Sequence, residues 1–109
     1  MNHYAEQAAI FKAISDDTRL KIIDMLSCGE LCACKILSAL DITQPTLSYH
    51  MKILTGCGIV KASRNGIWMN YNLEKMKADA LIAFLEELTR QKESCFCKPV
   101  TASEKNNYL

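Results

Sequence analysis

A hairpin signal within an otherwise helical chain most strongly constrains the fold. Residues 59–64 lead into Asn65-Gly66, a dipeptide that favours a two-residue turn between antiparallel strands. After this turn every second side chain is apolar, as in a half-buried strand: Ile67, Met69, Tyr71 and Leu73. The sequence therefore predicts a mainly α fold with one β-hairpin.

The other segments have the apolar spacing of helices. We expect helices over about residues 3–14, 16–29, 31–40, 43–55 and 74–92. At 109 residues the chain has room for one domain with its own core, which we assign to residues 1–92. Residues 93–109 are polar and include a proline, and we expect them to form a flexible tail that contains cysteines.

The third and fourth expected helices are separated by only three residues, Asp41-Ile42-Thr43. Thr43 is a suitable N-cap, with Pro45 in the first turn, where a missing N–H leaves no helical hydrogen bond unmade. Two short helices joined in this way are typical of a helix-turn-helix, and the hairpin that follows would form a wing. We therefore expect a winged helix-turn-helix.

Acidic residues are absent from the central part of the chain. The net charge is only +1, but residues 42–73 contain no Asp or Glu, so a phosphate backbone could approach them without repulsion. In the fourth helix the apolar residues Leu47, Met51 and Leu54 should face inwards and leave the polar ones exposed. The candidate DNA contacts are Gln44, Thr46, Ser48, Tyr49, His50, Lys52 and Arg64.

Two alternatives remain open at this surface. His50 suits either a phosphate contact or a packing contact. The helix pair by itself is also compatible with a polar helix in a small helical protein that does not bind DNA. The acid-free stretch and the hairpin directly after the fourth helix favour DNA binding.

The six cysteines must be interpreted by compartment. The N-terminal residues lack the basic start and apolar stretch of a signal peptide, and no apolar run approaches the roughly 20 residues of a membrane span. We expect a cytoplasmic protein without a membrane partner, whose thiols are reduced. Paired cysteines in that setting indicate binding of a thiophilic ligand or redox chemistry.

Cys32 and Cys34 form a Cys-X-Cys pair at the start of the third expected helix, where the helix dipole favours a thiolate. On an ideal helix, side chains two residues apart point about 200° apart. Both sulfurs could then bind one atom only if the first turn deformed. We expect such a deformation to re-aim the fourth helix, although burial in the core is the alternative role of these cysteines.

Several segments, in order, resemble the arsenic-responsive (ArsR/SmtB) repressor family. They are residues 14–20, 29–34, 44–54 and 64–73, and the similarity extends over about residues 5–90. The resemblance implies a homodimeric repressor, not an enzyme, that binds operator DNA when free and is released by its ligand. It also implies that Glu30-Leu31-Cys32-Ala33-Cys34 is the arsenic-binding motif.

The motif departs from the family pattern at two positions. Lys35 stands where many relatives have an acid, and Leu37 where the best-known version has a third cysteine. Arsenite takes three thiolates, so the third must come from elsewhere, with Cys95 or Cys97 as candidates. An organic trivalent arsenical needs only two thiolates. We expect one of these arsenicals as inducer and no required cofactor.

Other ligand sites and other classes of protein are less well supported by the sequence. Cys28 and Cys57 are weaker candidates, and the last helix contains no histidine for a zinc site. A repressor that senses oxidants or reactive sulfur through Cys32 and Cys34 remains the main alternative. A thiol-disulfide enzyme is disfavoured because the chain has no Cys-X-X-Cys in a βαβ context.

The first and last expected helices are richer in apolar residues than one small core requires. We expect them to pair across a two-fold axis. This would place the fourth helices of the two chains, the recognition helices, about 34–36 Å apart.

Overall fold

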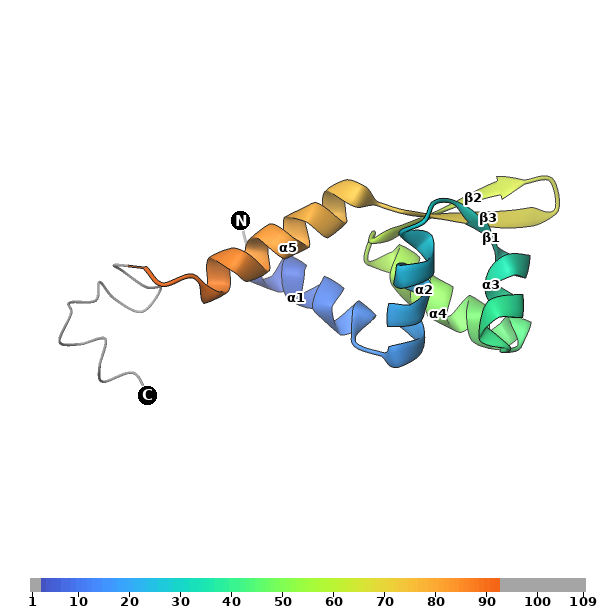
Figure 1. The fold of residues 1–109 in the computed structure, drawn as a ribbon, viewed down its shortest axis with the longest axis horizontal. Coiled ribbons are helices and arrows are strands. Elements are labelled where there is room, and N and C mark those ends of the chain that lie inside the picture. Colours follow the sequence, from blue (N-terminus) through green and yellow to red (C-terminus); the bar gives the residue numbers. More distant parts are fainter. Residues whose placement is uncertain (1–2, 93–109) are drawn as a thin grey trace.

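The computed structural model describes residues 3–92, which form five helices and a small sheet (Figure 1). In chain order the elements are α1 (His3–Ile14), α2 (Asp17–Leu26), β1 (Leu31–Cys32), α3 (Ala33–Leu40), α4 (Gln44–Gly56), β2 (Val60–Asn65), β3 (Trp68–Leu73) and α5 (Lys75–Thr89). The predicted mainly α fold with a hairpin is confirmed. None of the described helices is long and apolar enough to cross a membrane.

Local signals explain where the central helices begin and end. Asp16 caps α2 by accepting a hydrogen bond from the Arg19 backbone N–H at 3.1 Å. Thr43 caps α4, with Pro45 in its first turn, as predicted. Asp41 adopts a left-handed conformation (φ 54°) that ends α3 and redirects the chain into α4.

The sheet has three strands, in the order β1-β3-β2, all antiparallel. The predicted hairpin is present, but its turn is shifted by one residue. Asn65 still pairs with Trp68, so the two turn residues are Gly66 and Ile67, and Gly66 supplies the positive φ of 69° that the first turn position requires. We call the β2–β3 hairpin the wing.

The core lies between the helix-turn-helix and the base of the wing. Its fully buried side chains are Ile22, Ile36, Leu54 and Val60. The predicted inward positions of α4, Leu47 and Met51 with Leu54, are all buried. α4 is therefore held by its own apolar face.

The first and last helices lie side by side, apart from the wing (Figure 1). α1 buries only Gln7, Ile10 and Ala13, and α5 buries no residue. The Phe84 ring joins the two helices through an edge contact with Tyr4, at 5.9 Å between ring centroids. Much of the apolar surface of both helices stays uncovered.

Candidate nucleic-acid interface and thiol pair

The polar face of α4 and the wing lie next to each other. Five of the predicted DNA contacts are exposed on α4: Gln44, Thr46, Ser48, Tyr49 and Lys52. Arg64 is exposed on β2 and lines, with Gln44 and Ser48, a hollow between α4 and the wing. We call these six residues the DNA face.

Positive charge on this face is not neutralised by the protein itself. Within residues 3–92, neither Lys52 nor Arg64 forms an ion pair. Lys61, at the base of the wing, is paired with Glu74 at 3.3 Å. Lys52 and Arg64 are thus the two cations of the acid-free stretch that are available to phosphates.

His50 differs from the six residues of the DNA face because it is 9 % exposed. Its Nδ1 lies 3.0 Å from the Arg19 guanidinium, which can only donate, so Nδ1 accepts. Arg19 also donates to the Ala13 carbonyl oxygen. Of the two roles considered for His50, this geometry corresponds to packing: it ties α4 to the corner between α1 and α2.

Asp16 completes this corner, and its carboxylate lies 3.9 Å from His50 Nδ1. The backbone N–H of Arg19 lowers the pKa of Asp16, with a further contribution from the charge of the Arg19 guanidinium. The sequence patterns did not single out Arg19. No local signal could have linked Arg19 to a histidine 31 residues away.

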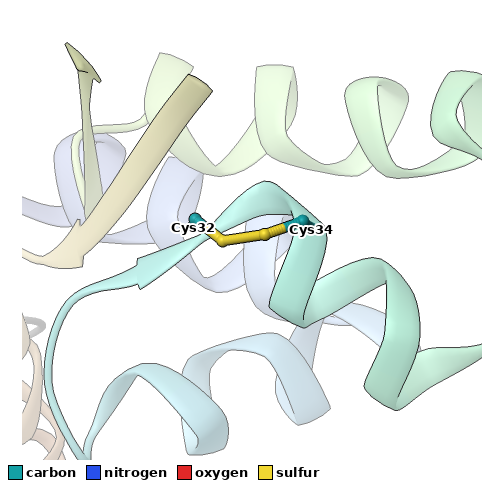
Figure 2. The surroundings of a disulfide bond; sticks show 2 residues. All are labelled: Cys32 and Cys34. Carbon is teal, nitrogen blue, oxygen red and sulfur yellow. A yellow bond between two sulfur atoms is a disulfide. The ribbon is translucent and has the colours of Figure 1, made fainter. Parts of the chain in front are cut away.

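The thiol pair, Cys32 and Cys34, lies where β1 passes into α3. The two sulfurs are joined in a disulfide, with the Cα atoms 5.3 Å apart (Figure 2). Cys32 is the N-cap residue, with extended backbone (φ −81°, ψ 156°), and the helix begins only at Ala33. The expectation that the helix starts at Leu31 is therefore wrong, and the sulfurs meet without deforming a helical turn.

The extended backbone of Cys32 has a tertiary cause. β1 pairs with β3, with Leu31 opposite Tyr71 and Cys32 opposite Asn70. The Asn72 side-chain amide also donates to Glu30 at 3.1 Å. One cysteine of the pair thus belongs to the sheet of the wing and the other to the first helix of the helix-turn-helix.

The other cysteines are separate from this pair. Cys28 is exposed, and Cys57 is half-buried with its Sγ 3.4 Å from the Leu54 carbonyl oxygen. Among residues 3–92, no three His, Cys, Asp or Glu side chains are grouped as metal ligands. Cys95 and Cys97, the candidates for a third sulfur, lie outside the described residues.

A second surface is apolar and lies between α1 and α5. It contains a groove of about 710 Å³ lined by Ile10, Met76 and Phe84 among others. Next to it α5 exposes Met76 (81 %), Ile82, Leu85 and Leu88. We call the exposed apolar residues of α5 the α5 stripe.

Comparison with known proteins relates the chain to bacterial regulators. Residues 16–62 match the family described as "Bacterial regulatory protein, arsR family". An arsenical resistance operon repressor of Staphylococcus aureus is 40% identical over 101 residues, covering 93% of this chain and 97% of the relative. A homologue of the cadmium resistance regulatory protein CadC, also from S. aureus, is 39% identical over 83 residues, or 73% of this chain and 69% of that protein.

Solved structures have the same fold. The crystal structure of an ArsR family transcriptional regulator superposes with a TM-score of 0.72 at 27% identity, covering 84% of this chain and all of that one. The relatives are named as transcriptional regulators and not as enzymes.

Proposed function

Since this chain belongs to the arsR family of bacterial transcriptional repressors, which bind DNA through a winged helix, we propose that it binds operator DNA as a homodimer and is released when a trivalent arsenical binds Cys32 and Cys34. The observation that carries this proposal is the position of the thiol pair at the junction of the wing sheet and α3. We place the protein in the cytoplasm, and it requires no cofactor.

The DNA face supplies both kinds of contact that an operator needs. Lys52 and Arg64 neutralise phosphates, while Gln44 and the hydroxyls of Thr46, Ser48 and Tyr49 reach base edges or phosphate oxygens. All of these residues lie within the acid-free stretch of residues 42–73. His50 acts indirectly, by holding α4 through Arg19.

The dimer forms through α1 and α5. A groove with apolar walls and the neighbouring α5 stripe are the surfaces that a second copy would cover. Ile82, Leu85 and Leu88 follow one another at intervals of three residues, so they share one side of α5. A two-fold dimer would present two recognition helices to a palindromic site.

The thiol pair matches the chemistry of trivalent arsenic. Thiolates are soft ligands, and in the reduced chain the two sulfurs can bind one soft atom. An organic arsenical with one carbon substituent, R–As(OH)₂, exchanges two As–O bonds for two As–S bonds, and two water molecules leave with the thiol protons. Arsenite needs a third thiolate, for which Cys95 or Cys97 of the same or the partner chain is the candidate.

Release follows from the junction between the wing and the helix-turn-helix. An arsenic atom between Cys32 and Cys34 fixes the separation of β1 and the first turn of α3. Because β1 pairs with β3, a changed separation moves the wing relative to α3 and α4. This coupling replaces the helix deformation expected from an ideal helix.

A redox-sensing repressor is the second candidate function. The disulfide between Cys32 and Cys34 favours it, because an oxidant that converts the two thiols to this bond would act on the same junction. The two candidate functions use the same fold and the same two cysteines, and they differ only in whether an arsenical or an oxidant is the inducer.

The test is fluorescence anisotropy of labelled operator during titration with phenylarsine oxide, arsenite or hydrogen peroxide. Under a phosphine reductant, the arsenicals should release the wild type. Cys32→Ser and Cys34→Ser should retain operator affinity within about twofold but lose release, because a hydroxyl is a poor substitute for a thiolate. Cys28→Ser, an exposed cysteine four residues before Cys32, is the matched control and should respond normally.

Two outcomes decide against the arsenical proposal. Full release of the Cys32→Ser, Cys34→Ser double variant would remove the thiol pair from the mechanism. Release of the wild type by peroxide alone would establish the redox function instead.

A further inference from the structure

A small pocket adjoins the thiol pair on the side of the DNA face. It lies between α3, α4 and the wing and has a volume of about 260 Å³. Cys34 forms part of its wall, together with the wing residues Trp68 and Met69. Gln44, Ser48 and Arg64 of the DNA face line the same space. The pocket therefore borders the proposed sensor and the proposed operator-binding surface at once.

We propose that this pocket receives the substituent of an aryl trivalent arsenical held by Cys32 and Cys34, which makes aryl arsenicals the preferred inducer class. This inference rests on the proposed function and names its ligand more narrowly. Once two valences of arsenic are bonded to the sulfurs, the third carries the aryl group. Because Cys34 lines the pocket, an arsenical bound to its sulfur carries that group beside the pocket.

The size and walls of the pocket suit an aromatic ring. A cavity of roughly 150 Å³ lined by apolar side chains is sufficient for benzene; this pocket is larger and has polar as well as apolar walls. The Trp68 indole offers a ring for stacking or edge contact, and the Met69 thioether a favourable sulfur contact. Arsenite or a methyl arsenical leaves these walls without a partner.

The location of the pocket also gives the substituent a direct effect on DNA binding. A ring inserted between α4 and the wing occupies the space bordered by Gln44, Ser48 and Arg64. DNA contacts from these three residues and the bound ring then compete. An aryl arsenical should therefore release operator at a lower fraction of occupied thiol pairs than a methyl arsenical does.

The bond changes leave arsenic trivalent throughout. Phenylarsine oxide adds water to give the dihydroxy form, and two thiols displace two hydroxyl groups as water. The disulfide form does not react in this way, so a phosphine reductant must first convert it to the dithiol.

The test is calorimetric titration of the full chain, under a phosphine reductant, with phenylarsine oxide and with methylarsonous acid. Trp68→Ala should weaken binding of phenylarsine oxide about three- to tenfold, the range of one aromatic contact, and leave methylarsonous acid within about twofold. Trp68→Phe, which keeps a ring in the wall of the pocket, should retain most of the wild-type affinity for phenylarsine oxide.

The unaltered protein provides a readout that does not depend on a substitution. Trp68 is the one tryptophan of the chain. Its emission should change more on binding of phenylarsine oxide than on binding of methylarsonous acid, because only the former places a ring beside the indole.

The outcomes distinguish a failure of the proposed function from a failure of the pocket assignment alone. If neither arsenical binds, or if the Cys32→Ser, Cys34→Ser double variant binds both, the proposed function fails. If both arsenicals bind through the thiol pair but Trp68→Ala leaves their affinity ratio unchanged and Trp68 emission responds equally to both, only the pocket assignment fails.

Discussion

Helices α4 and α5 are similar in length, 13 and 15 residues, but differ in what holds them. α4 buries Leu47, His50, Met51 and Leu54, whereas α5 buries none of its residues. α4 also has an N-terminal cap, Thr43, while the residue before α5, Glu74, makes no capping side-chain bond. The chain by itself thus fixes α4, the helix that we assign to DNA contact, and leaves α5 with an uncovered apolar side.

This contrast is consistent with different roles for the two helices, DNA contact for α4 and pairing with a second copy for α5. A helix that must present side chains to base edges needs a defined orientation, which burial against a close-packed core provides. A helix that pairs with a second copy keeps apolar residues exposed until that copy arrives. The difference between the two helices should therefore be measurable by substitution.

The largest effect should come from the α5 stripe. The double variant Ile82→Asp, Leu85→Asp places charges on the surface that we assign to the dimer, and desolvating them would oppose association. We expect a monomer in sedimentation experiments and a loss of operator affinity on the order of a hundredfold or more, because the two half-sites are no longer bound together.

Leu54→Ala is the matched substitution in α4. It should lower the free energy of unfolding by about 2–5 kcal/mol, as a large cavity does, since Leu54 is fully buried. It should leave the oligomeric state of the folded protein unchanged. A wild type that sediments only as a monomer at micromolar concentration would contradict the assignment of the α5 stripe.

An intermediate effect should follow from removing cations of the DNA face. Lys52→Ala and Arg64→Ala should each weaken operator binding several-fold and reduce the slope of log K against log salt by about 0.9. Gln44→Ala should instead relax sequence preference, which a panel of mutated operators would measure.

The control for these variants is Lys61→Ala, because Lys61 is already paired with Glu74. It should change the salt slope less than either Lys52→Ala or Arg64→Ala. Equal slopes for all three variants and the wild type would mean that DNA binds elsewhere.

The smallest effect should be a change in how thermal stability depends on pH, caused by Asp16 at the corner between α1 and α2. The pKa of Asp16 is lowered chiefly by the backbone N–H of Arg19, so its carboxylate stabilises the fold above its ordinary pKa, and this contribution is lost as pH falls through the lowered value, below about pH 4. Asp16→Asn keeps a capping oxygen but does not titrate. It should therefore flatten the loss of thermal stability in that window.

Glu87 on α5 is the comparison for Asp16. Its pKa is lowered chiefly by a side-chain hydrogen bond from Arg90, in an exposed pair. Each carboxylate makes thermal stability fall as the pH is lowered, and each amide variant removes its own contribution to that fall. High salt should abolish the contribution of Glu87 but not that of Asp16, because the backbone contact of Asp16 is screened less. Thermal melts at two salt concentrations across this pH range would check the difference.

Much of the fold and of the DNA face could be predicted from local signals. Thr43 and Pro45 mark the start of α4, and the spacing of Leu47, Met51 and Leu54 identifies its buried side. Exposure of Gln44 and its polar neighbours then follows from the helical period alone. The absence of acids in residues 42–73 needs no structure to be seen.

Other features lie beyond local signals. β1 has only two residues, too few for a strand period to be recognised, and it exists because β3 pairs with it. The same is true of the Arg19–His50 contact, which joins residues far apart in the chain. The turn at Gly66-Ile67 depends on the register of β2 against β3, which one residue of slippage would alter.

By itself the sequence determined the helical segments and the hairpin, because these depend on residues close together in the chain. The acid-free stretch and the Cys32–Cys34 pair are read directly from the sequence. Only the tertiary structure decided that Cys32 is extended and Cys34 helical, that the pair joins the wing to α3, and that a pocket adjoins it. The physical reason is the pairing of β1 with β3: backbone hydrogen bonds to a strand far along the chain hold Cys32 extended, and the helix begins at Ala33.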